Sequence, residues 1–331
     1  GWFNYAFTAP SFPDYPKYGV WPDGYYVSTY EGSILGVYAL DRASMLNGSP
    51  ATSQRFTISS LTPSTTGGCT NIRNTRILPS DLDGAAPPAG APNYFFRSVE
   101  QCQDVSNPVD RLEVFEFDVD WTTPSNSSFT LVSTLTPANF ALVPCSPGIR
   151  DCIPQPGTTR MLDALSNRPL HRLQYRNFGG YETLVTNQAV DAGSGVSGKR
   201  WYELRRNGGI WGIHQQGTYS PDSNDRWMGS IAMDRTGNMA LGYSVSSSSV
   251  FPAIRYTGRL SGDALGMMTE PEVTLRAGAG SQTWTSRWGD YSAMSVDPVD
   301  GCTFWYTQEY MPASGNWVTY VGSFAFDECT S

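Results

Sequence analysis

Three aspartates stand at or just before the starts of predicted strands, and they are the residues best suited to acid–base chemistry. They are Asp14, Asp225 and Asp290. A glycoside hydrolase needs two carboxyl groups about 5 to 9.5 Å apart, one as the acid and the other as the base or nucleophile. If the strands that carry them converge, any two of the three can form such a pair. They are therefore the candidate catalytic residues, and if the chain is an enzyme we expect a glycosidase.

Cationic and aromatic side chains accompany these aspartates. Arginine holds a carboxylate through two parallel hydrogen bonds, and tryptophan and tyrosine rings offer flat apolar faces to a sugar. The same residues can instead be structural, with arginine stacking on tryptophan or pairing with aspartate between neighbouring units. The candidate ligand-binding residues are Arg226, Trp227, Trp284, Arg287, Trp288, Tyr291, His171 and Arg172.

Metal and cofactor sites find little support in the sequence. His171 and His214 are the only histidines, and neither lies in a His/Cys cluster, so no metal centre and no cofactor are predicted. Calcium prefers oxygen ligands in tight loops, although aspartates in turns more often cap their own backbone. The calcium candidates are Asp81, Asp83, Asp297 and Asp300. Neither a Gly-x-Ser-x-Gly sequence nor a phosphate-binding loop is present.

Composition indicates a turn-rich, all-β protein. The 331 residues include 33 Gly and 23 Pro, 13% are aromatic, and only 16% are charged, against about 25% in a typical domain. Long helical and disordered proteins have a different composition. A net charge of −8 lacks the basic surface of a nucleic-acid-binding protein. No apolar run reaches the roughly 18 residues that would span a membrane.

One structural unit recurs along the chain. It begins with a short apolar strand, passes through a turn that contains Asp and Gly, and continues into a strand rich in aromatic and β-branched residues. In the first unit the predicted strands are Lys17–Trp21, Tyr25–Tyr30, Ile34–Leu40 and Gln54–Ile58. Four strands per repeat are typical of propeller blades. The predicted blades cover residues 11–60, 77–140, 163–220, 225–280 and 286–331.

The ends of the chain suggest how the blades form a ring. The last unit offers three strands, Ala293–Val296, Thr303–Glu309 and Trp317–Phe326, whereas Phe3–Thr8 within residues 1–10 is a strand without a unit. If these join, residues 1–331 form one closed five-bladed propeller domain with no exposed edge at the junction. Alternatively, the chain is part of a larger propeller. A β-sandwich or an irregular stack of sheets also fits the many turns.

Three stretches of the chain resemble uncharacterised secreted bacterial β-propeller proteins of the sialidase or BNR-repeat kind. They are residues 14–26, 226–234 and 287–300. The resemblance covers most of the chain and implies a propeller, but it implies no established activity. The sialidase Asp-box, Ser-x-Asp-x-Gly-x-Thr-Trp, is matched by Ser295–Trp305 only with inserted residues, and an Arg-Ile-Pro motif is absent. These proteins continue with further blade-like sequence on the N-terminal side, which favours the larger ring.

The cysteines point to an oxidising compartment. There are six, none in a Cys-x-x-Cys pair, and their short separations favour Cys69–Cys102, Cys145–Cys152 and Cys302–Cys329, one of 15 connectivities. Disulfides persist outside the cytosol, and Lys17 and Lys199 are the only lysines. We expect a secreted or cell-surface protein. The chain has no leader sequence at its start, so we expect a mature form or a fragment.

Three functions fit these observations. The first is binding of an extracellular ligand, a carbohydrate or a surface polymer, without catalysis. The second is a glycoside hydrolase or lyase with a funnel of carboxylates and arginines. The third is a structural role, in which other polypeptide completes the propeller or an extracellular assembly.

Overall fold

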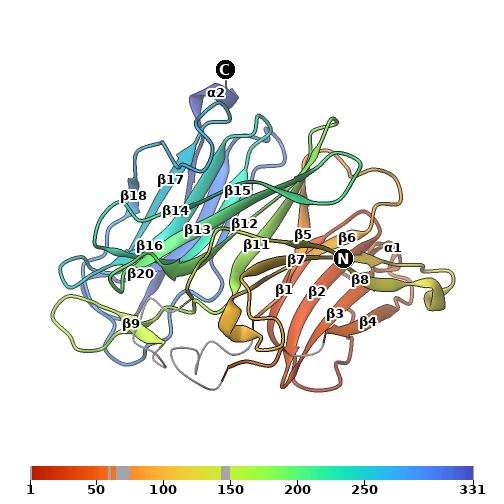
Figure 1. Cartoon of the computed structure of the whole chain (residues 1–331), viewed down its shortest axis with the longest axis horizontal. Coiled ribbons are helices and arrows are strands. Elements are labelled where there is room, and N and C mark those ends of the chain that lie inside the picture. The colour runs from red at the N-terminus through yellow and green to blue at the C-terminus, as the bar shows by residue number, and fades with distance from the viewer. Residues whose placement is uncertain (1, 59–60, 65–74, 143–149, 331) are drawn as a thin grey trace.

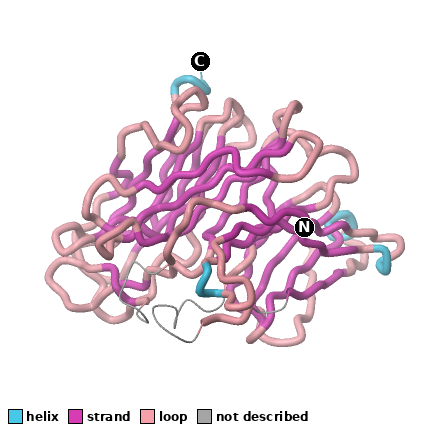
Figure 2. The backbone as a smooth tube through the Cα atoms, in the orientation of Figure 1, coloured by secondary structure: helices cyan, strands magenta, loops and turns pink. Residues whose placement is uncertain are grey.

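Strands make up nearly all the regular structure of this protein. The computed structural model describes residues 2–58, 61–64, 75–142 and 150–330. Strands dominate the backbone in Figure 2, and the helices are short pieces at its periphery. The strands form sets of antiparallel neighbours, each set built from consecutive segments of the chain. The predicted all-β propeller is confirmed.

The first two sheets come from the N-terminal part of the chain and lie on the right in Figure 1. The first contains β1 (Asp14–Val20), β2 (Gly24–Glu31), β3 (Ile34–Asp41) and β4 (Ser53–Ile58). The second set contains β5 (Leu78–Asp83), β6 (Asn93–Val99), β7 (Arg111–Asp118) and β8 (Ser128–Leu135). Helix α1 (Arg42–Asn47) and the 3₁₀ turns Gln101–Gln103 and Pro124–Asn126 lie in their connections.

The other sheets follow in chain order. A small ribbon pairs β9 (Asp151–Ile153) with β10 (Leu162–Asp163). The third set is β11 (Pro169–Asn177), β12 (Glu182–Asp191), β13 (Ser197–Arg206) and β14 (Gly212–Tyr219). The fourth is β15 (Asp225–Met233), β16 (Met239–Ser246), β17 (Ala253–Arg259) and β18 (Val273–Arg276). The last is β19 (Ala293–Val296), β20 (Phe304–Tyr310) and β21 (Val318–Phe324), followed by helix α2 (Asp327–Thr330).

The first strand of each set lies innermost. Strand β1 packs against β5, β11 packs against β15, and β15 packs against β19. Strands β15 and β16 are buried along their whole length, because sheets cover both of their faces. A strand buried on both faces lacks the alternation of buried and exposed residues that a strand with one solvent-facing side shows. In contrast, β1 alternates between buried and exposed positions.

Two neighbouring blades are joined more closely than the sequence suggested. Strand β11 pairs in parallel with β5, from Leu173↔Ser80 to Arg176↔Asp83, so that two blades share one eight-stranded sheet. Buried Arg172 secures this junction, because its guanidinium donates to Asp81 Oδ2 at 3.0 Å and to Asp83 Oδ1 at 2.6 Å. The separate blades predicted for residues 77–140 and 163–220 are thus hydrogen-bonded to each other.

A glycine allows the inner strands to approach one another. A Cβ atom on Gly19 would lie 2.2 Å from the carbonyl oxygen of Ser80. Strand β1 can therefore lie directly against the backbone of β5 only because residue 19 has no side chain. The approach is reinforced by the Val20 nitrogen, which donates to Asp81 Oδ1 at 2.9 Å.

The largest core cluster fills the space between the first three sets of strands and is strongly aromatic. The Trp21 ring lies edge-on to Tyr175 at 4.7 Å between centroids, and its indole nitrogen donates to the carbonyl of Ala91 at 3.0 Å. Tyr94 stacks on Tyr175 and meets Trp211 edge-on. These buried rings explain the high aromatic content of the sequence.

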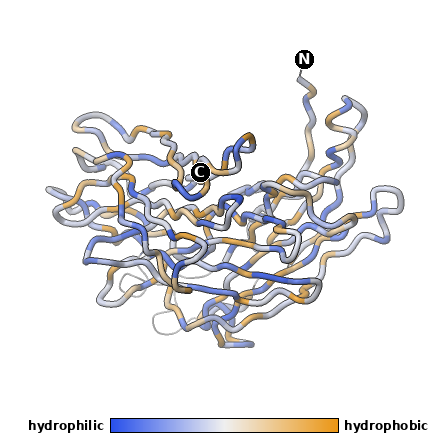
Figure 3. Tube along the Cα trace, turned by 90° about the horizontal axis from the view of Figure 1, so that it is seen from above, coloured by the Kyte–Doolittle hydropathy of each residue, from blue (hydrophilic) through white to orange (hydrophobic). Residues whose placement is uncertain are grey.

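The predicted closing strand is wrong. Residues 3–8 form no strand; they run along helix α1, where the Tyr5 hydroxyl lies 3.0 Å from the carbonyl oxygen of Ser49 and 3.2 Å from that of Ser44. The N-terminal segment projects from the body as an extended arm in Figure 3, apart from the C-terminus. In the part of the chain that the structure describes, β21 pairs with β20 alone.

Because β21 has no further strand beside it among the described residues, the outer part of the last sheet is exposed. Trp305 on β20 is 43% exposed and Val321 on β21 is 53% exposed. Completion of the propeller by other polypeptide stays a prediction.

The cysteine predictions are confirmed where the structure describes both partners. Cys302 and Cys329 form a disulfide with a Cα–Cα distance of 5.6 Å. Cys102 and Cys152 are also disulfide-bonded, and their predicted partners, Cys69 and Cys145, lie outside the described residues. Among the described residues, no helix is long and apolar enough to cross a membrane.

The calcium candidates have other partners. Asp81 and Asp83 bind Arg172. Asp297 accepts from the Val299 nitrogen, and Asp300 accepts from the Cys302 and Thr303 nitrogens, so both cap their own turn. Within the described ranges, no group of three His, Cys, Asp or Glu residues is placed to hold a metal ion. The four candidate aspartates thus take part in ion pairs and turn capping, and calcium binding by them stays a possibility that the sequence raised.

Candidate functional site

The beginnings of several inner strands meet around one buried tyrosine. Tyr15 opens β1 and packs with Trp227 and Met228 of β15 and with Trp288, which precedes β19. Leu170 of β11 belongs to the same cluster. Segments that are far apart in the sequence therefore supply side chains to a single region at the centre of the propeller.

The backbone is irregular at this end of the inner strands. Strand register shifts between Asp14 and Lys17 in β1 and between Trp227 and Ser230 in β15. Tyr15 and Met228 within these bulges have φ of 53° and 45°, in the left-handed region that residues with a side chain seldom adopt. Bulges redirect side chains and are common beside functional sites.

Cations surround the Tyr15 ring. The Lys17 ammonium lies 3.9 Å from its centroid and 3.9 Å from that of Tyr291, and it donates to the carbonyl oxygen of Asp290 at 3.2 Å. The guanidinium carbon of Arg168 lies 4.6 Å from the Tyr15 centroid, and that of Arg76 lies 5.9 Å from it. We call Tyr15, Lys17, Arg76 and Arg168 the central cluster.

Burial changes the ionisation of this cluster. It lowers the pKa of Lys17 to about 7, with Asp290 opposing the shift and Arg168 adding to it. Burial also lowers the pKa of Arg76 to about 9, with a further contribution from Arg168. It raises the pKa of Tyr15 to about 12. The cluster is thus a region where positive charge is costly.

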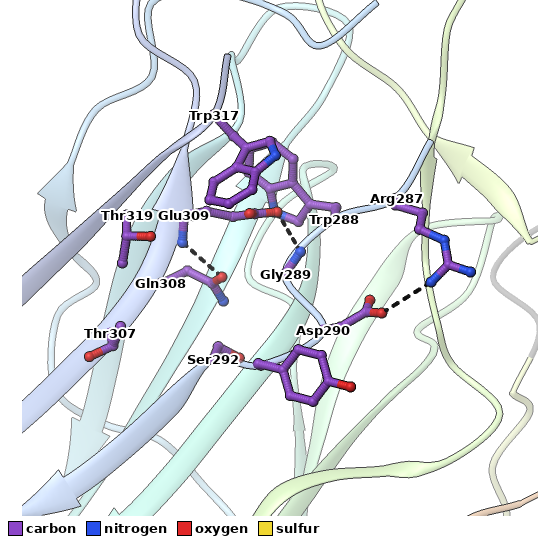
Figure 4. Close-up of a pocket in the computed structure, with 11 residues that line it drawn as sticks. Arg287, Trp288, Gly289, Asp290, Ser292, Thr307, Gln308, Glu309, Trp317 and Thr319 are labelled. Atoms are coloured by element: carbon purple, nitrogen blue, oxygen red, sulfur yellow. Dashed lines mark hydrogen bonds and ion pairs between the residues drawn. The ribbon is translucent and has the colours of Figure 1, made fainter. Parts of the chain in front are cut away.

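A pocket of about 330 Å³ opens beside the central cluster, on the last sheet. Figure 4 shows Asp290, Glu309 and Trp317 around it, with Arg287 at its edge. Trp317 is 47% exposed and Tyr291 is 62% exposed, so both present ring surface to solvent. The pocket residues are Arg287, Trp288, Gly289, Asp290, Tyr291, Ser292, Thr307, Gln308, Glu309, Trp317 and Thr319.

Two carboxyl groups in this pocket have environments that separate their ionisation. Burial and the negative charge of Asp290 raise the pKa of Glu309 to about 7, although the Gly289 nitrogen donates to Glu309 Oε1. Burial raises the pKa of Asp290 as well, but Arg287, with Nη1 3.6 Å from Asp290 Oδ2, favours its charged form. Below about pH 7, Glu309 is therefore protonated and can donate a proton.

A second pocket, of about 490 Å³, lies beyond the first along the same segment. Its lining includes Thr283 and Ser286, whereas the first pocket begins at Arg287. Hydroxyl groups and Arg160, whose Nε donates to the Thr283 carbonyl at 3.4 Å, make it polar. The remaining lining residues are Asp151, Thr158, Thr159 and Met161.

The structure separates the three candidate catalytic aspartates. Asp290 lines the first pocket, whereas Asp14 is exposed and Asp225 is 6% exposed, and neither lines either pocket. Asp225 accepts from the Ser197 nitrogen at 2.8 Å and so connects β15 to β13, while burial raises its pKa to about 6. A catalytic role of Asp14 or Asp225 stays a prediction.

Three predicted ligand-binding residues have structural roles. Arg226 is 0% exposed and its guanidinium binds Asp222 at 2.8 Å and Glu272 at 2.6 Å. Trp227 is 0% exposed in the core. Arg172 binds the two carboxylates on β5. All three side chains are buried and in contact with other parts of the chain, and ligand binding by them stays a prediction.

The other predicted ligand-binding residues have mixed positions. Arg287, Trp288 and Tyr291 line the first pocket, but Trp288 is 2% exposed and its indole nitrogen donates to Ser244 Oγ at 2.9 Å. Trp284 is 46% exposed and lines neither pocket. His171 is half-buried, and burial lowers its pKa to about 3, with Lys17 and Arg172 adding to the effect. It is therefore neutral at physiological pH.

Sequence reasoning missed Glu309, Lys17 and Trp317. Glu309 is the last residue of a predicted strand and belongs to no recognisable motif. Only the pairing of its strand in the folded sheet brings it to Gly289. A usable signal existed for Lys17, because lysine is so rare in this chain. Trp317 stands in a Gly-Asn turn that gave no functional indication.

Comparisons with known proteins yield fold similarity only. No protein-family model and no curated protein sequence matches the chain. Among solved structures, an α-L-arabinanase of Penicillium chrysogenum complexed with arabinobiose is 11% identical, with 96% of each chain covered and a TM-score of 0.43. A GH93 α-L-arabinofuranosidase of Fusarium graminearum is 9% identical, with 96% and 94% covered and a TM-score of 0.44.

An endo-arabinase of Bacteroides thetaiotaomicron is 13% identical, with 97% of this chain and 99% of that chain covered and a TM-score of 0.38. Similarity at this level says nothing about what this chain binds. Its function has to be argued from its own residues.

Proposed function

We propose that this protein is an extracellular glycoside hydrolase whose acid and base are Glu309 and Asp290. The observation that carries the proposal is the raised pKa of Glu309, about 7, in a pocket shared with the carboxyl group of Asp290. Glycosidic-bond cleavage uses two neighbouring carboxyl groups, one of which must hold a proton as the acid. Most surface carboxylates have no such partner.

The two groups have distinct roles in the reaction. Glu309 donates its proton to the glycosidic oxygen, which leaves as an alcohol when its bond to the anomeric carbon breaks. Asp290 then acts in one of two ways: it takes a proton from the water that attacks this carbon, or it forms an ester to the carbon that water later hydrolyses. Either route consumes one water molecule. In the ester route Glu309 regains its proton from that water, whereas in the direct route the proton ends on Asp290 and exchange with solvent restores both groups.

Aromatic side chains provide the surface for the sugar. Trp317 and Tyr291 are exposed at the pocket, and such rings pack against the apolar faces of sugar rings while hydroxyls elsewhere form hydrogen bonds. Thr307, Thr319 and Gln308 supply hydrogen-bonding groups in the same lining. The Cys302–Cys329 disulfide supports an oxidising compartment, which is where extracellular polysaccharides occur.

Binding without cleavage is the second candidate. It is favoured by the exposure of Trp317 and Tyr291, which suits recognition as well as catalysis. A pocket that only binds would not need Glu309 to hold its proton, so the two candidates differ in what they require of this residue.

The test is release of new reducing ends from arabinan, galactan, xylan, polygalacturonate and alginate. The wild type should cleave at least one, and Glu309→Gln and Asp290→Asn should each lower the rate at least a hundredfold, in line with the usual contribution of acid–base groups. Asp118→Asn, at an exposed position ending β7, is the matched control and should retain the rate. Full activity of Glu309→Gln contradicts the proposal, and saccharide binding without cleavage supports the second candidate.

A further inference from the structure

The central cluster places three buried cations around one tyrosine ring. Lys17, Arg76 and Arg168 are 4%, 6% and 5% exposed. Isolated buried charges are expensive, because protein cannot replace the hydration that a charged group loses. Three cations at one site therefore call for anionic partners.

The described residues do not supply these partners for Lys17 and Arg168. Lys17 donates to a backbone carbonyl, and Arg168 Nε donates to Asn167 Oδ1 at 3.0 Å. Among the described residues, no carboxylate lies within ion-pair distance of either cation, and Asp163 is already paired with Arg150. The internal segments outside the described residues, 59–60, 65–74 and 143–149, contain no Asp or Glu.

A second observation points to a missing ligand. The Tyr15 hydroxyl is buried, and in the described part of the chain it has no hydrogen-bond partner. An unsatisfied buried hydroxyl costs about 1–3 kcal/mol. A bound oxygen anion would accept its proton as well as the hydrogen bonds of the neighbouring cations.

The central cluster adjoins the proposed catalytic pocket. Tyr291 lies between them: its ring contacts Tyr15 at 5.8 Å between centroids, covers the Lys17 ammonium and lines the pocket. Tyr291 is 62% exposed, so its ring has solvent on the side away from the central cluster. Movement of this one side chain would connect the ammonium to the pocket, a few ångströms from Asp290.

We propose that the central cluster binds an anionic oxygen group, a carboxylate or a sulfate ester, carried by the saccharide in the adjoining pocket. The substrate class is then an acidic saccharide rather than a neutral one. Lys17 and Arg168 compensate the negative charge, and the Tyr15 hydroxyl donates a hydrogen bond to it. This inference rests on the proposed function for the location of the sugar, but the anion site itself does not require cleavage.

The test measures binding of matched oligosaccharides by titration calorimetry at constant ionic strength. The probes are trigalacturonate, a monosulfated galactotriose and neutral galactotriose, with inorganic sulfate as a probe that needs no sugar. The wild type should bind at least one anionic trisaccharide tenfold or more tightly than the neutral one. The carboxylated and sulfated probes distinguish the two sources of the anion.

The chain contains its own control for the variants. Lys17→Met should weaken binding of the anionic probe at least tenfold and leave neutral galactotriose unchanged, and Arg168→Gln should act in the same direction. Lys199 is the other lysine; it is 0% exposed, and none of the described residues bonds its ammonium. Lys199→Met makes the same substitution at a buried lysine outside the cluster and should leave anion binding unchanged.

Each outcome decides the inference. Equal affinity for anionic and neutral probes, or equal losses in Lys17→Met and Lys199→Met, would overturn it. Cleavage of neutral glycans at equal rates by the wild type and Lys17→Met would overturn it while leaving the hydrolase proposal intact. Anion binding that depends on Lys17, without cleavage of any glycan, would support it and contradict hydrolysis.

Discussion

The backbone nitrogen of Gly289 donates a hydrogen bond to the carboxyl group of Glu309, so the residue that precedes Asp290 holds the second carboxyl of the pocket. Glu309 lies near the C-terminal end of β20, whereas Gly289 belongs to the segment that leads into β19. Gly289 has φ of 59°, which allows the chain to turn its nitrogen towards Glu309. This one hydrogen bond within the last blade therefore brings the carboxyl groups of Glu309 and Asp290 to the same pocket.

The pH dependence of cleavage should follow these two groups. Because the pKa of Glu309 is raised to about 7, its acid form is lost above that pH, and the rate should fall about tenfold per pH unit there. The acidic limit is set by ionisation of Asp290, whose pKa burial raises above its usual value. The measurement is kcat/KM against pH. A rate that keeps rising above pH 8 would exclude Glu309 as the acid.

Lys17 should make the folded protein more stable as the pH rises from about 7 to about 10.5. Its pKa is lowered from 10.5 to about 7 on folding, so in this window the unfolded chain binds more protons than the folded one. Lys17→Met should raise the free energy of unfolding at pH 7 by on the order of 3 kcal/mol and reduce the slope. Denaturation in urea between pH 6 and pH 10 measures both. A slope unchanged by the substitution would contradict the burial of an uncompensated ammonium.

Arg172 should be essential for the junction between β5 and β11. Its guanidinium is 3% exposed and binds Asp81 and Asp83. Arg172→Met would leave two carboxylates without their cation, and removing one partner of a buried ion pair costs about 3–5 kcal/mol. Arg287→Met, at a side chain that is 84% exposed, should change the free energy of unfolding by less than about 0.5 kcal/mol. Similar losses in both variants would show that the junction does not depend on this ion pair.

The Cys302–Cys329 disulfide should stabilise the last blade. It closes a loop with a sequence separation of 27 and ties helix α2 to the turn before β20. Replacing both cysteines by alanine should lower the free energy of unfolding by about 3.5 kcal/mol, from the loop entropy that the unfolded chain regains. Thermal and chemical unfolding of the double variant give the value. An unchanged unfolding midpoint would indicate that α2 is held by its packing alone.

The local sequence pattern was enough to predict the strands of the blades. The predicted strands of the first unit agree with β1–β4 to within a few residues, because turns at Asp23-Gly24 and Gly32-Ser33 separate runs of aromatic and β-branched residues. These signals act over a few residues and survive in any tertiary context. The sequence of a strand does not show which other strand it pairs with, however. The parallel pairing of β5 with β11 and the unpaired residues 3–8 were therefore not predicted.

In the candidate site, too, some features were predictable from the sequence and others were decided only by the fold. Composition, the recurring strand unit and the cysteine spacing indicated an all-β propeller with disulfides, and Asp290 and Tyr291 were among the candidate site residues. The sequence could not distinguish Arg226, which forms ion pairs with Asp222 and Glu272, from Lys17, which forms no ion pair with a carboxylate of the described residues. Burial and pairing are properties of side chains brought together from distant strands. Only the tertiary structure therefore decided that Glu309 joins Asp290 and that cations gather around Tyr15.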